Sequence, residues 1–202
     1  MDRDDHTLAF YSSEASAYTS RGQTPNQQFL ERFMARLPPG GSVLELGCGA
    51  GQDGEVMISR GFDVTMTDGT PEIAFAAATR LGRPVSTLLF EDLNDIEAFD
   101  GVWANACLLH VPRSALPRAL SNVHAALKAG GAFYASFKTG VSEGRDTLGR
   151  YYNYPSQSWL TALYEALNWD ALSISTTEGD GYDGAPTQWL HVMATKSAKG
   201  GG

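Results

Sequence analysis

Cysteine is scarce in this chain of 202 residues, which contains only Cys48 and Cys107. Two thiols cannot supply the several disulfides of a small secreted scaffold, and the sequence has no CxxC pair of the kind that binds zinc. Its four histidines show no metal-ligand spacing either, so we expect no metal site. This scarcity favours a reducing compartment, and we expect a cytoplasmic protein.

Long apolar runs are also missing. No window approaches the roughly 18 uninterrupted apolar residues of a membrane span. The segment Met1–His6 is charged and acidic, whereas a signal peptide begins with a basic region followed by an apolar one. We therefore expect no association with a membrane and no export.

Basic residues are outnumbered, because 15 Lys and Arg face 23 Asp and Glu and leave a formal net charge of −8. That balance disfavours a phosphate backbone as a partner, so we expect no nucleic-acid partner. The hydrophobic fraction of 43% is sufficient for the core of one domain without disulfides. We expect a monomer or a homodimer.

The spacing of apolar residues alternates between that of strands and that of helices. It predicts helices over residues 25–37 (with Thr24 as N-cap), 52–60, 71–81, 114–127 and 156–167, and strands over residues 42–46, 63–67, 85–90, 101–105, 132–137, 171–177 and 188–194. A glycine-rich linker at residues 179–184 makes the last two strands an antiparallel pair. We predict an α/β fold, a Rossmann-like doubly wound sheet of seven strands that is mostly parallel and ends in a C-terminal antiparallel hairpin.

The turn after the first predicted strand is the most informative segment. Glu45 ends the strand, and glycines follow at Gly47, Gly49 and Gly51. Such glycines allow a sharp turn and bring the bare backbone close to a ligand. A dinucleotide fingerprint requires its third glycine where this chain has Gln52. An ordinary strand-to-helix turn also uses glycines, but the combination with an acid favours a nucleoside-cofactor site whose ligand carries positive charge.

This segment resembles motif I of the class I S-adenosylmethionine-dependent methyltransferases, and the resemblance extends along most of the chain. It implies S-adenosyl-L-methionine as cofactor and methyl transfer to the oxygen, nitrogen, sulfur or metalloid atom of a small molecule. The small size and the segment Leu108–Val111 resemble the bacterial tellurite-resistance-like enzymes. An Asn/Asp-Pro-Pro-Tyr/Phe signature is absent, which disfavours methylation of DNA amino groups and of certain protein amides.

The resemblance also implies which residues bind the cofactor. Asp68 follows the second strand, where an acid accepts hydrogen bonds from both ribose hydroxyls, although an acid can also start a turn before Thr70. Asp92 and Leu93 are expected beside the adenine, with Phe90 as a further candidate. The predicted cofactor-binding residues are Tyr11, Tyr18, Glu45, Gly47, Cys48, Gly49, Gly51, Asp68, Gly69, Asp92, Leu93, Asn105 and Ala106.

Residues 1–24 resemble the N-terminal lid of small methyltransferases, in which aromatic side chains such as Tyr11 and Tyr18 cover the cofactor. A lid excludes water from the reactants. A peripheral helix that packs on the core is the alternative interpretation. We predict a methyltransferase domain over residues 25–197 and a flexible tail over residues 198–202.

Two residues are predicted to act in catalysis. His110 titrates near neutral pH when unperturbed and is able to take a proton from an incoming nucleophile, as is Tyr152. A histidine that only forms a hydrogen bond at a helix start is the alternative. For Cys48 and Cys107 we expect ordinary packing of small buried thiols.

The segment after the fifth strand is rich in groups that bind substrates. Lys138, Arg145 and Arg150 are able to hold an anionic group, and Tyr151 adds an aromatic wall. A surface loop whose arginines pair with neighbouring acids is the alternative.

Two other functions remain open on the sequence alone. A NAD-dependent oxidoreductase has a similar sheet, but the glycine spacing and the C-terminal hairpin argue against it. A non-catalytic cofactor-binding module would retain the same cleft, and no decay of the glycine turn or of Asp68 points to one.

Overall fold

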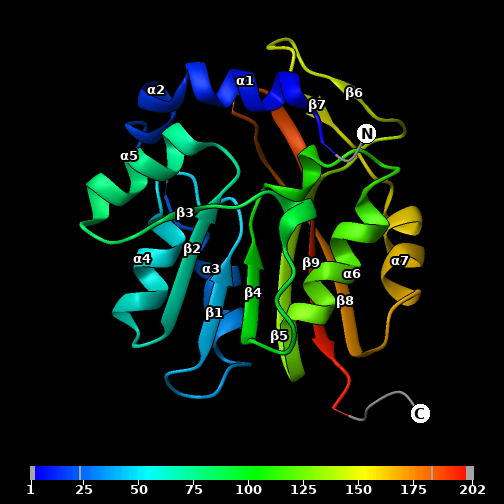
Figure 1. Cartoon of the computed structure of the whole chain (residues 1–202). Helices are drawn as coiled ribbons and strands as arrows, with labels where there is room; N and C mark the ends of the chain where they lie inside the picture. The colour runs from blue at the N-terminus through cyan, green and yellow to red at the C-terminus, as the bar shows by residue number, and fades with distance from the viewer. Residues whose placement is uncertain (1–2, 23, 183, 199–202) are drawn as a thin grey trace.

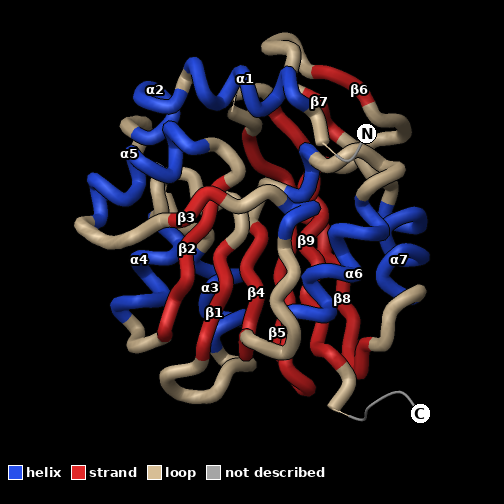
Figure 2. Tube along the Cα trace, in the orientation of Figure 1, coloured by secondary structure: helices blue, strands red, loops and turns tan. Residues whose placement is uncertain are grey.

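The computed structural model describes residues 3–22, 24–182 and 184–198. It is a layered α/β structure in which one central sheet is covered by helices on both faces (Figures 1 and 2). Among the described residues, no helix has the length and apolar character needed to cross a bilayer.

The sheet has seven strands in the order β3-β2-β1-β4-β5-β9-β8. β1 to β5 pair in parallel, and β9 runs antiparallel to both of its neighbours. The predicted fold class is therefore confirmed. The strands are β1 (Ser42–Glu45), β2 (Asp63–Asp68), β3 (Ser86–Thr87), β4 (Phe99–Ala104), β5 (Leu127–Lys138), β8 (Trp169–Asp180) and β9 (Pro186–Lys196).

Two apolar clusters, one on each face, hold the helices against the sheet. On one face α3 (Gln27–Met34), α4 (Gln52–Ser59) and α5 (Pro71–Leu81) contribute side chains to a cluster with Trp103 and Tyr134. On the other face α6 (Leu116–Ala126) and α7 (Gln157–Glu165) pack in a larger cluster. Burial of apolar area on both faces is the expected driving force for a parallel sheet.

The third strand is much shorter than predicted. Only Ser86 and Thr87 pair with β2, and the chain then forms a 3-10 helix η1 (Phe90–Asp92). This strand lies at the sheet edge, where only one neighbour supplies hydrogen bonds. The prediction of Thr24 as an N-cap is also wrong, because α3 starts after Asn26, whose backbone N–H is bonded to Asp53.

The N-terminal segment folds as two short helices, α1 (Asp5–Ser13) and α2 (Ala15–Thr19), which lie across the carboxyl ends of the parallel strands (Figure 1). A small hairpin of β6 (Gly144–Arg145) and β7 (Tyr151–Tyr152), which the sequence did not predict, lies beside α1. The domain boundaries stay predictions, and residues 199–202 of the predicted tail lie outside the described residues.

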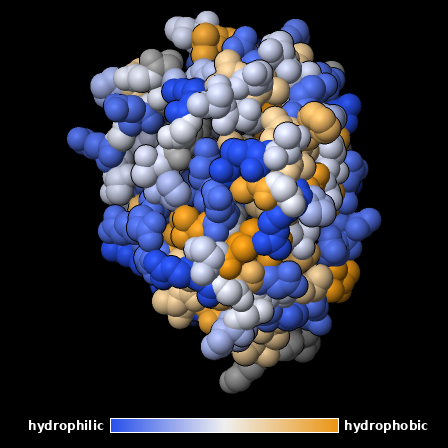
Figure 3. Space-filling view, turned by 90° about the vertical axis from the view of Figure 1, so that its left-hand side faces the viewer, coloured by the Kyte–Doolittle hydropathy of each residue, from blue (hydrophilic) through white to orange (hydrophobic). Residues whose placement is uncertain are grey.

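The face in Figure 3 shows apolar side chains in small separate patches among hydrophilic ones. It therefore presents no broad apolar surface among the described residues visible there.

Gly101 in β4 lies directly under α3, where an added Cβ would approach Phe33 Cζ to 2.6 Å and Leu37 Cδ2 to 2.8 Å. We expect Gly101→Ala to lower the free energy of unfolding by about 1–3 kcal/mol, because overpacking pushes the helix off the strand. Gly144 in β6 is the matched control, since no heavy atom lies within 4 Å of its Cβ position. Gly144→Ala is expected to change stability by less than about 1 kcal/mol. Equal urea midpoints for the two variants would contradict this account.

Candidate active site

The sheet order reverses between β1 and β4, because the chain builds β2 and β3 on one side of β1 and β4 on the other. At such a switch point the carboxyl ends of the strands leave a crevice in which ligands bind. A cavity of about 540 Å³ lies here, between the ends of β1, β4, β5, β8 and β9 and the N-terminal helices.

The glycine turn forms the floor of this cavity. Gly47, Gly49 and Gly51 have φ angles of +61°, +58° and +82°, in the left-handed region that favours glycine. An added Cβ at Gly47 would overlap the side chain of Cys107, and one at Gly49 would lie 3.2 Å from the ring of Tyr18. The turn therefore lies between the end of β4 and Tyr18 of α2, and it leaves no room for side chains at Gly47 and Gly49.

Glu45 places a carboxyl group in the cavity wall, and one oxygen of that group lacks a hydrogen-bond partner among the described residues. The residue is 2% exposed, and its Oε2 atom has no hydrogen-bond partner among the described residues. Burial raises the pKa of this carboxyl well above its usual range, and the nearby acids Asp53 and Asp68 raise it further. A buried acceptor that lacks a donor costs free energy, so the site suits a ligand with an N–H donor or a positive charge.

Asp53, in the first turn of α4, is a site residue that the sequence analysis missed. Its carboxylate accepts hydrogen bonds from Trp103 Nε1 at 2.9 Å and from Asn105 Nδ2 at 3.0 Å. Burial raises the pKa of Asp53. Asn105 is held from its other side by Ser136, whose hydroxyl donates to Asn105 Oδ1 at 2.8 Å. The only available signal was an acid two residues after the glycine turn.

Asp68 ends β2 beside the glycine turn. Its carboxylate accepts from the backbone N–H of Gly49 at 3.1 Å and of Thr70 at 2.9 Å, so it braces the turn and starts α5. Burial raises the pKa of Asp68 to about 6. Asp68 lines neither cavity, but its neighbour Gly69 lines a second one of about 50 Å³.

The second cavity corresponds to the predicted adenine region, and it is covered by α1. It is lined by Leu89, Phe90 and Glu91 from the end of β3, and by Thr7 and Leu8 from α1. Phe90 thus lies at the cavity, whereas Asp92 is exposed and Leu93 is buried in the core. Neither Asp92 nor Leu93 lines this cavity, and their assignment to the adenine stays a prediction.

His110 lines both cavities, and both of its ring nitrogens form hydrogen bonds. Nδ1 lies 2.6 Å from the backbone carbonyl oxygen of Tyr151, and Nε2 lies 2.9 Å from the hydroxyl of Tyr11. Burial lowers the pKa of His110 to about 4, so the ring is neutral at pH 7. Tyr152, the other predicted catalytic residue, packs against it with ring centroids 4.6 Å apart.

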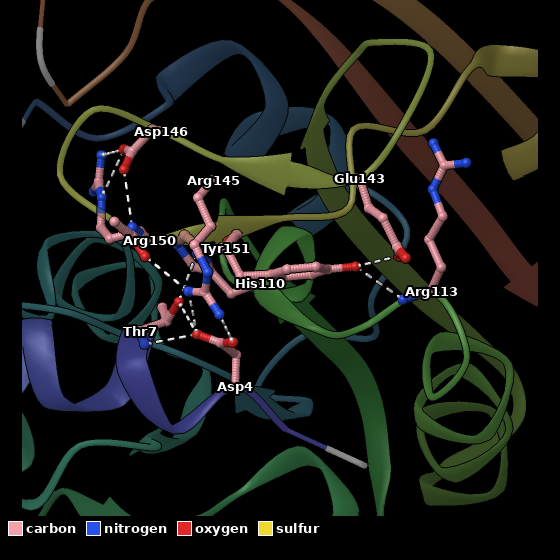
Figure 4. A network of polar contacts seen from close by, with 10 residues as sticks. Asp4, Thr7, His110, Arg113, Glu143, Arg145, Asp146, Arg150 and Tyr151 are labelled. Atoms are coloured by element: carbon pink, nitrogen blue, oxygen red, sulfur yellow. Dashed lines mark hydrogen bonds and ion pairs between the residues drawn. The ribbon is translucent and has the colours of Figure 1, made fainter.

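Arg150 is 1% exposed and lies beside Tyr11. Its Nη2 donates to Asp146 at 2.6 Å and its Nη1 donates to the Tyr11 hydroxyl at 3.1 Å. Figure 4 shows Arg150 and Asp146 together on the turn of the β6–β7 hairpin, close to His110 and Tyr151. Arg150 therefore connects the hairpin to α1.

A second contact ties α1 to the same hairpin. Asp4 accepts from Thr7 N and forms an ion pair with Arg145 at 2.6 Å, while Thr7 Oγ1 accepts from Tyr151 N at 2.8 Å (Figure 4). The ion pair lowers the pKa of Asp4 to about 2, although burial acts in the opposite direction. Arg145 is thus paired on the surface and does not line the large cavity, and its contact with substrate stays a prediction.

Tyr151, predicted to contact substrate, does not line the large cavity either. Its hydroxyl donates to Glu143 at 2.7 Å and accepts from the backbone N–H of Arg113, so the side chain points toward these two residues (Figure 4). Gly51 does not line the cavity either, and its role is the left-handed turn into α4. The predicted residues that do line the large cavity are Tyr11, Tyr18, Glu45, Gly47, Cys48, Gly49, Asn105, Ala106, His110, Lys138, Arg150 and Tyr152.

The end of the cavity near β5 and the β8–β9 connection is aromatic, and it is lined by charges of both signs, Lys138 as well as Glu178 and Asp180. Lys138 is 6% exposed, and its Nζ lies 4.7 Å from the ring centroid of Tyr152 and 5.9 Å from that of Trp189. Tyr182 stacks on Tyr18 with centroids 5.6 Å apart. The sequence analysis did not identify Trp189 and Tyr182, because only the fold brings the last hairpin to this site.

The two cysteines pack as expected. Burial raises the pKa of both thiols, so Cys48 and Cys107 stay protonated, and the Cys107 thiol donates to the carbonyl oxygen of Leu46. Within the described ranges, no group of three or more His, Cys, Asp and Glu side chains is arranged to hold a metal ion.

Residues 43–131 match the family described as "Methyltransferase domain". Over 93 residues, the chain is 31% identical to the protein named "Putative methyltransferase YqeM" of Bacillus subtilis (strain 168), and this match covers 45% of the chain but only 38% of YqeM.

Two solved structures have a similar fold. One is the Burkholderia thailandensis 1,6-didemethyltoxoflavin-N1-methyltransferase with bound 1,6-didemethyltoxoflavin and S-adenosylhomocysteine. Its TM-score is 0.75 and its sequence identity is 22%, and the match covers 96% of this chain and 88% of that chain. The other is the Haemonchus contortus phosphoethanolamine N-methyltransferase 2 with S-adenosyl-L-methionine, with a TM-score of 0.73, 14% identity, and 92% and 57% covered. The tellurite-resistance-like subtype stays a prediction. Residues 43–131 thus match a methyltransferase domain, and the chain has the fold of these solved S-adenosylmethionine-dependent methyltransferases.

Proposed function

We propose that the protein transfers a methyl group from S-adenosyl-L-methionine to a nucleophilic atom of a small molecule. The observation that carries this proposal is the unsatisfied carboxyl of Glu45 beside the left-handed glycine turn. The glycines leave room for a ligand against the backbone, and the carboxyl group suits the ammonium group of the cofactor's methionine part.

The residues present fit the whole cofactor. Glu45, Gly47 and Gly49 would hold its methionine part, Asp68 would accept from its ribose hydroxyls, and Phe90 would pack on its adenine. When bound, the cofactor supplies a methyl group that its sulfonium makes electrophilic. The small volume of the second cavity indicates that α1 must shift to admit the adenine, which supports the proposed lid.

The protein's own contribution is alignment, exclusion of water and handling of a proton. Alignment of nucleophile and methyl carbon lowers the entropic part of the barrier. The lid segments α1 and α2 cover the cavity, and neutral His110 is available as a base. Lys138 and Arg150 favour an acceptor with an electron-rich or anionic group, while Tyr152 holds His110 and Lys138 in place.

The two alternative functions, an oxidoreductase and a non-catalytic binding module, differ in how much support they have. The match of residues 43–131 to a methyltransferase domain includes the glycine turn and Asp68, so it leaves little support for a nicotinamide-dependent oxidoreductase. A non-catalytic binding module would share the cofactor site, and only turnover separates it from an enzyme. A monomeric or homodimeric state and a cytoplasmic location also stay proposals.

Calorimetric titration with S-adenosylhomocysteine and, separately, with NAD tests the cofactor class. We expect micromolar binding of S-adenosylhomocysteine and none of NAD, because the glycine turn lacks the dinucleotide spacing. Asp68→Asn should weaken binding at least about tenfold, since hydrogen bonds to a charged group contribute about 1.5–3 kcal/mol. Asp63→Asn is the matched control, at the exposed opposite end of β2. Binding of NAD alone would refute the proposal.

The affinity for S-adenosylhomocysteine should depend on pH through Asp68. The ribose hydroxyls donate to the ionised carboxylate, and the pKa of Asp68 in the free protein is about 6. Below pH 6 we therefore expect Asp68 to add a loss of affinity that approaches tenfold per pH unit, because a proton must leave this carboxyl before the ligand binds, in addition to the effect of Glu45, whose pKa is also raised. The same titration of Asp68→Asn should be flatter. A wild-type affinity that does not change between pH 5 and pH 8 would contradict this role.

A further inference from the structure

The direction of each hydrogen bond around His110 follows from its partners. A backbone carbonyl oxygen only accepts, so the proton of the neutral ring lies on Nδ1, which donates to Tyr151 O at 2.6 Å. Nε2 is then an acceptor, and the Tyr11 hydroxyl donates to it at 2.9 Å. Arg150 has only donors, and its Nη1 gives one hydrogen bond to the Tyr11 oxygen at 3.1 Å.

Among the residues that the structure describes, His110 and Arg150 are the hydrogen-bond partners of the Tyr11 hydroxyl, which leaves one acceptor site open on its oxygen. A tyrosine hydroxyl has one proton, directed here at His110, and two lone pairs, of which Arg150 takes one. Both Tyr11 and His110 line the large cavity, next to Asn105 and Ala106 at the end of β4. A ligand in that cavity therefore meets an acceptor on Tyr11 with a base directly behind it.

We propose that Tyr11 is a catalytic proton relay, and that the methyl acceptor is a neutral group bearing an O–H or an N–H, such as an alcohol, a phenol or a ring N–H. This proposal rests on the proposed function. It gives Tyr11 a role in the chemistry in addition to the lid role that the sequence indicated.

The step balances in atoms and charge. The acceptor atom attacks the methyl carbon with a lone pair, and the carbon–sulfur bond breaks with its electron pair left on sulfur. The acceptor's proton moves to the Tyr11 oxygen as the Tyr11 proton moves to His110 Nε2, and the electrons of the broken O–H or N–H bond stay on the acceptor. The positive charge lost by the sulfonium is then carried by the imidazolium of His110.

The basicity of the His110 ring limits which methyl acceptors the relay is able to deprotonate. A ring whose pKa is about 4 cannot remove a proton from an aliphatic ammonium, whose pKa is near 10, before attack. It is strong enough for a proton that becomes acidic as the methyl arrives, which is the situation of a neutral hydroxyl or ring N–H. The charged groups nearest His110 are Arg150, Lys138 and Asp146, and the two cations also disfavour a cationic acceptor.

The ring nitrogens of His110 test the hydrogen-bond chain without turnover. In protein labelled with nitrogen-15 at histidine, with S-adenosylhomocysteine bound and the signals assigned through His110→Gln, we expect a neutral ring with the proton on Nδ1 at pH 7. Tyr11→Phe should shift the Nε2 signal. Tyr164→Phe is the matched control, because the buried Tyr164 hydroxyl has no partner among the described residues. A proton on Nε2, or a charged ring at pH 7, would overturn the proposal.

Turnover tests the acceptor class. Alcohols, phenols, ring N–H compounds, aliphatic amines and acceptors that are already ionised, such as thiolates and inorganic oxyanions, are assayed by formation of S-adenosylhomocysteine. We expect methylation of the neutral acceptors, with kcat at least about 100-fold lower in Tyr11→Phe and unchanged in Tyr164→Phe. The double variant Tyr11→Phe/His110→Gln should lose no more than the single ones, because the two groups act as one unit.

The other outcomes have distinct meanings. Methylation of ionised acceptors alone, or an equal loss of kcat for ionised and neutral acceptors in Tyr11→Phe, would overturn the relay and leave Tyr11 a lid residue. Failure of the wild type to bind S-adenosylhomocysteine would instead refute the proposed function, and the ring signals of the free protein would still report the Tyr11–His110 contact.

Discussion

The burial of one guanidinium group determines how the active site is assembled. Arg150 is 1% exposed, and a charge taken out of water is tolerated only when it is paired and hydrogen-bonded. Its carboxylate partner, Asp146, comes from the same hairpin, its hydroxyl partner, Tyr11, from α1, and a ring 4.6 Å away, Tyr182, from the β8–β9 connection. Because Tyr11 and Tyr182 lie far from Arg150 in the sequence, this set of contacts forms only when the hairpin, α1 and the β8–β9 connection meet over the cavity.

The contact between Arg150 and Tyr11 also connects the position of α1 to the proposed proton transfer. Arg150 occupies a lone pair of the Tyr11 oxygen, which leaves the Tyr11 proton free to point at His110. His110 is oriented in turn by the carbonyl oxygen of Tyr151, next to Arg150 in the chain. If α1 moved away to admit a cofactor, the tyrosine–histidine contact would be lost with it. In the proposed mechanism, the base is therefore complete only when α1 has closed and excluded water, which would protect a reactive methyl donor from hydrolysis.

Local sequence signals predicted the scaffold well, and the site only in part. Periodicity and glycine placement located the strands, and the turn from Glu45 to Gly51 indicated where the cavity would lie, because these features depend on residues close in the sequence. Asp53 and Trp189 were missed, since their roles arise from segments that meet only in the fold. Arg145 was assigned to the substrate because its charge was visible, whereas its partner Asp4 is distant in the sequence. The third strand was predicted too long, because β3 lies at the sheet edge and pairs only through Ser86 and Thr87.

The distribution of charge in the cavity explains how one site accommodates two reactants. Glu45, Asp53 and Asp68 lie together at the cofactor end, and burial raises the pKa of each. An empty site is thus costly in its ionised form, and a cationic ligand relieves that cost. Elsewhere the cavity is lined by Lys138 and Arg150, and also by the acids Glu178 and Asp180. A cofactor with a sulfonium and an ammonium group fits the end with Glu45 and Asp53, and in the proposed mechanism Lys138 and Arg150 beside His110 favour an acceptor that brings no positive charge of its own.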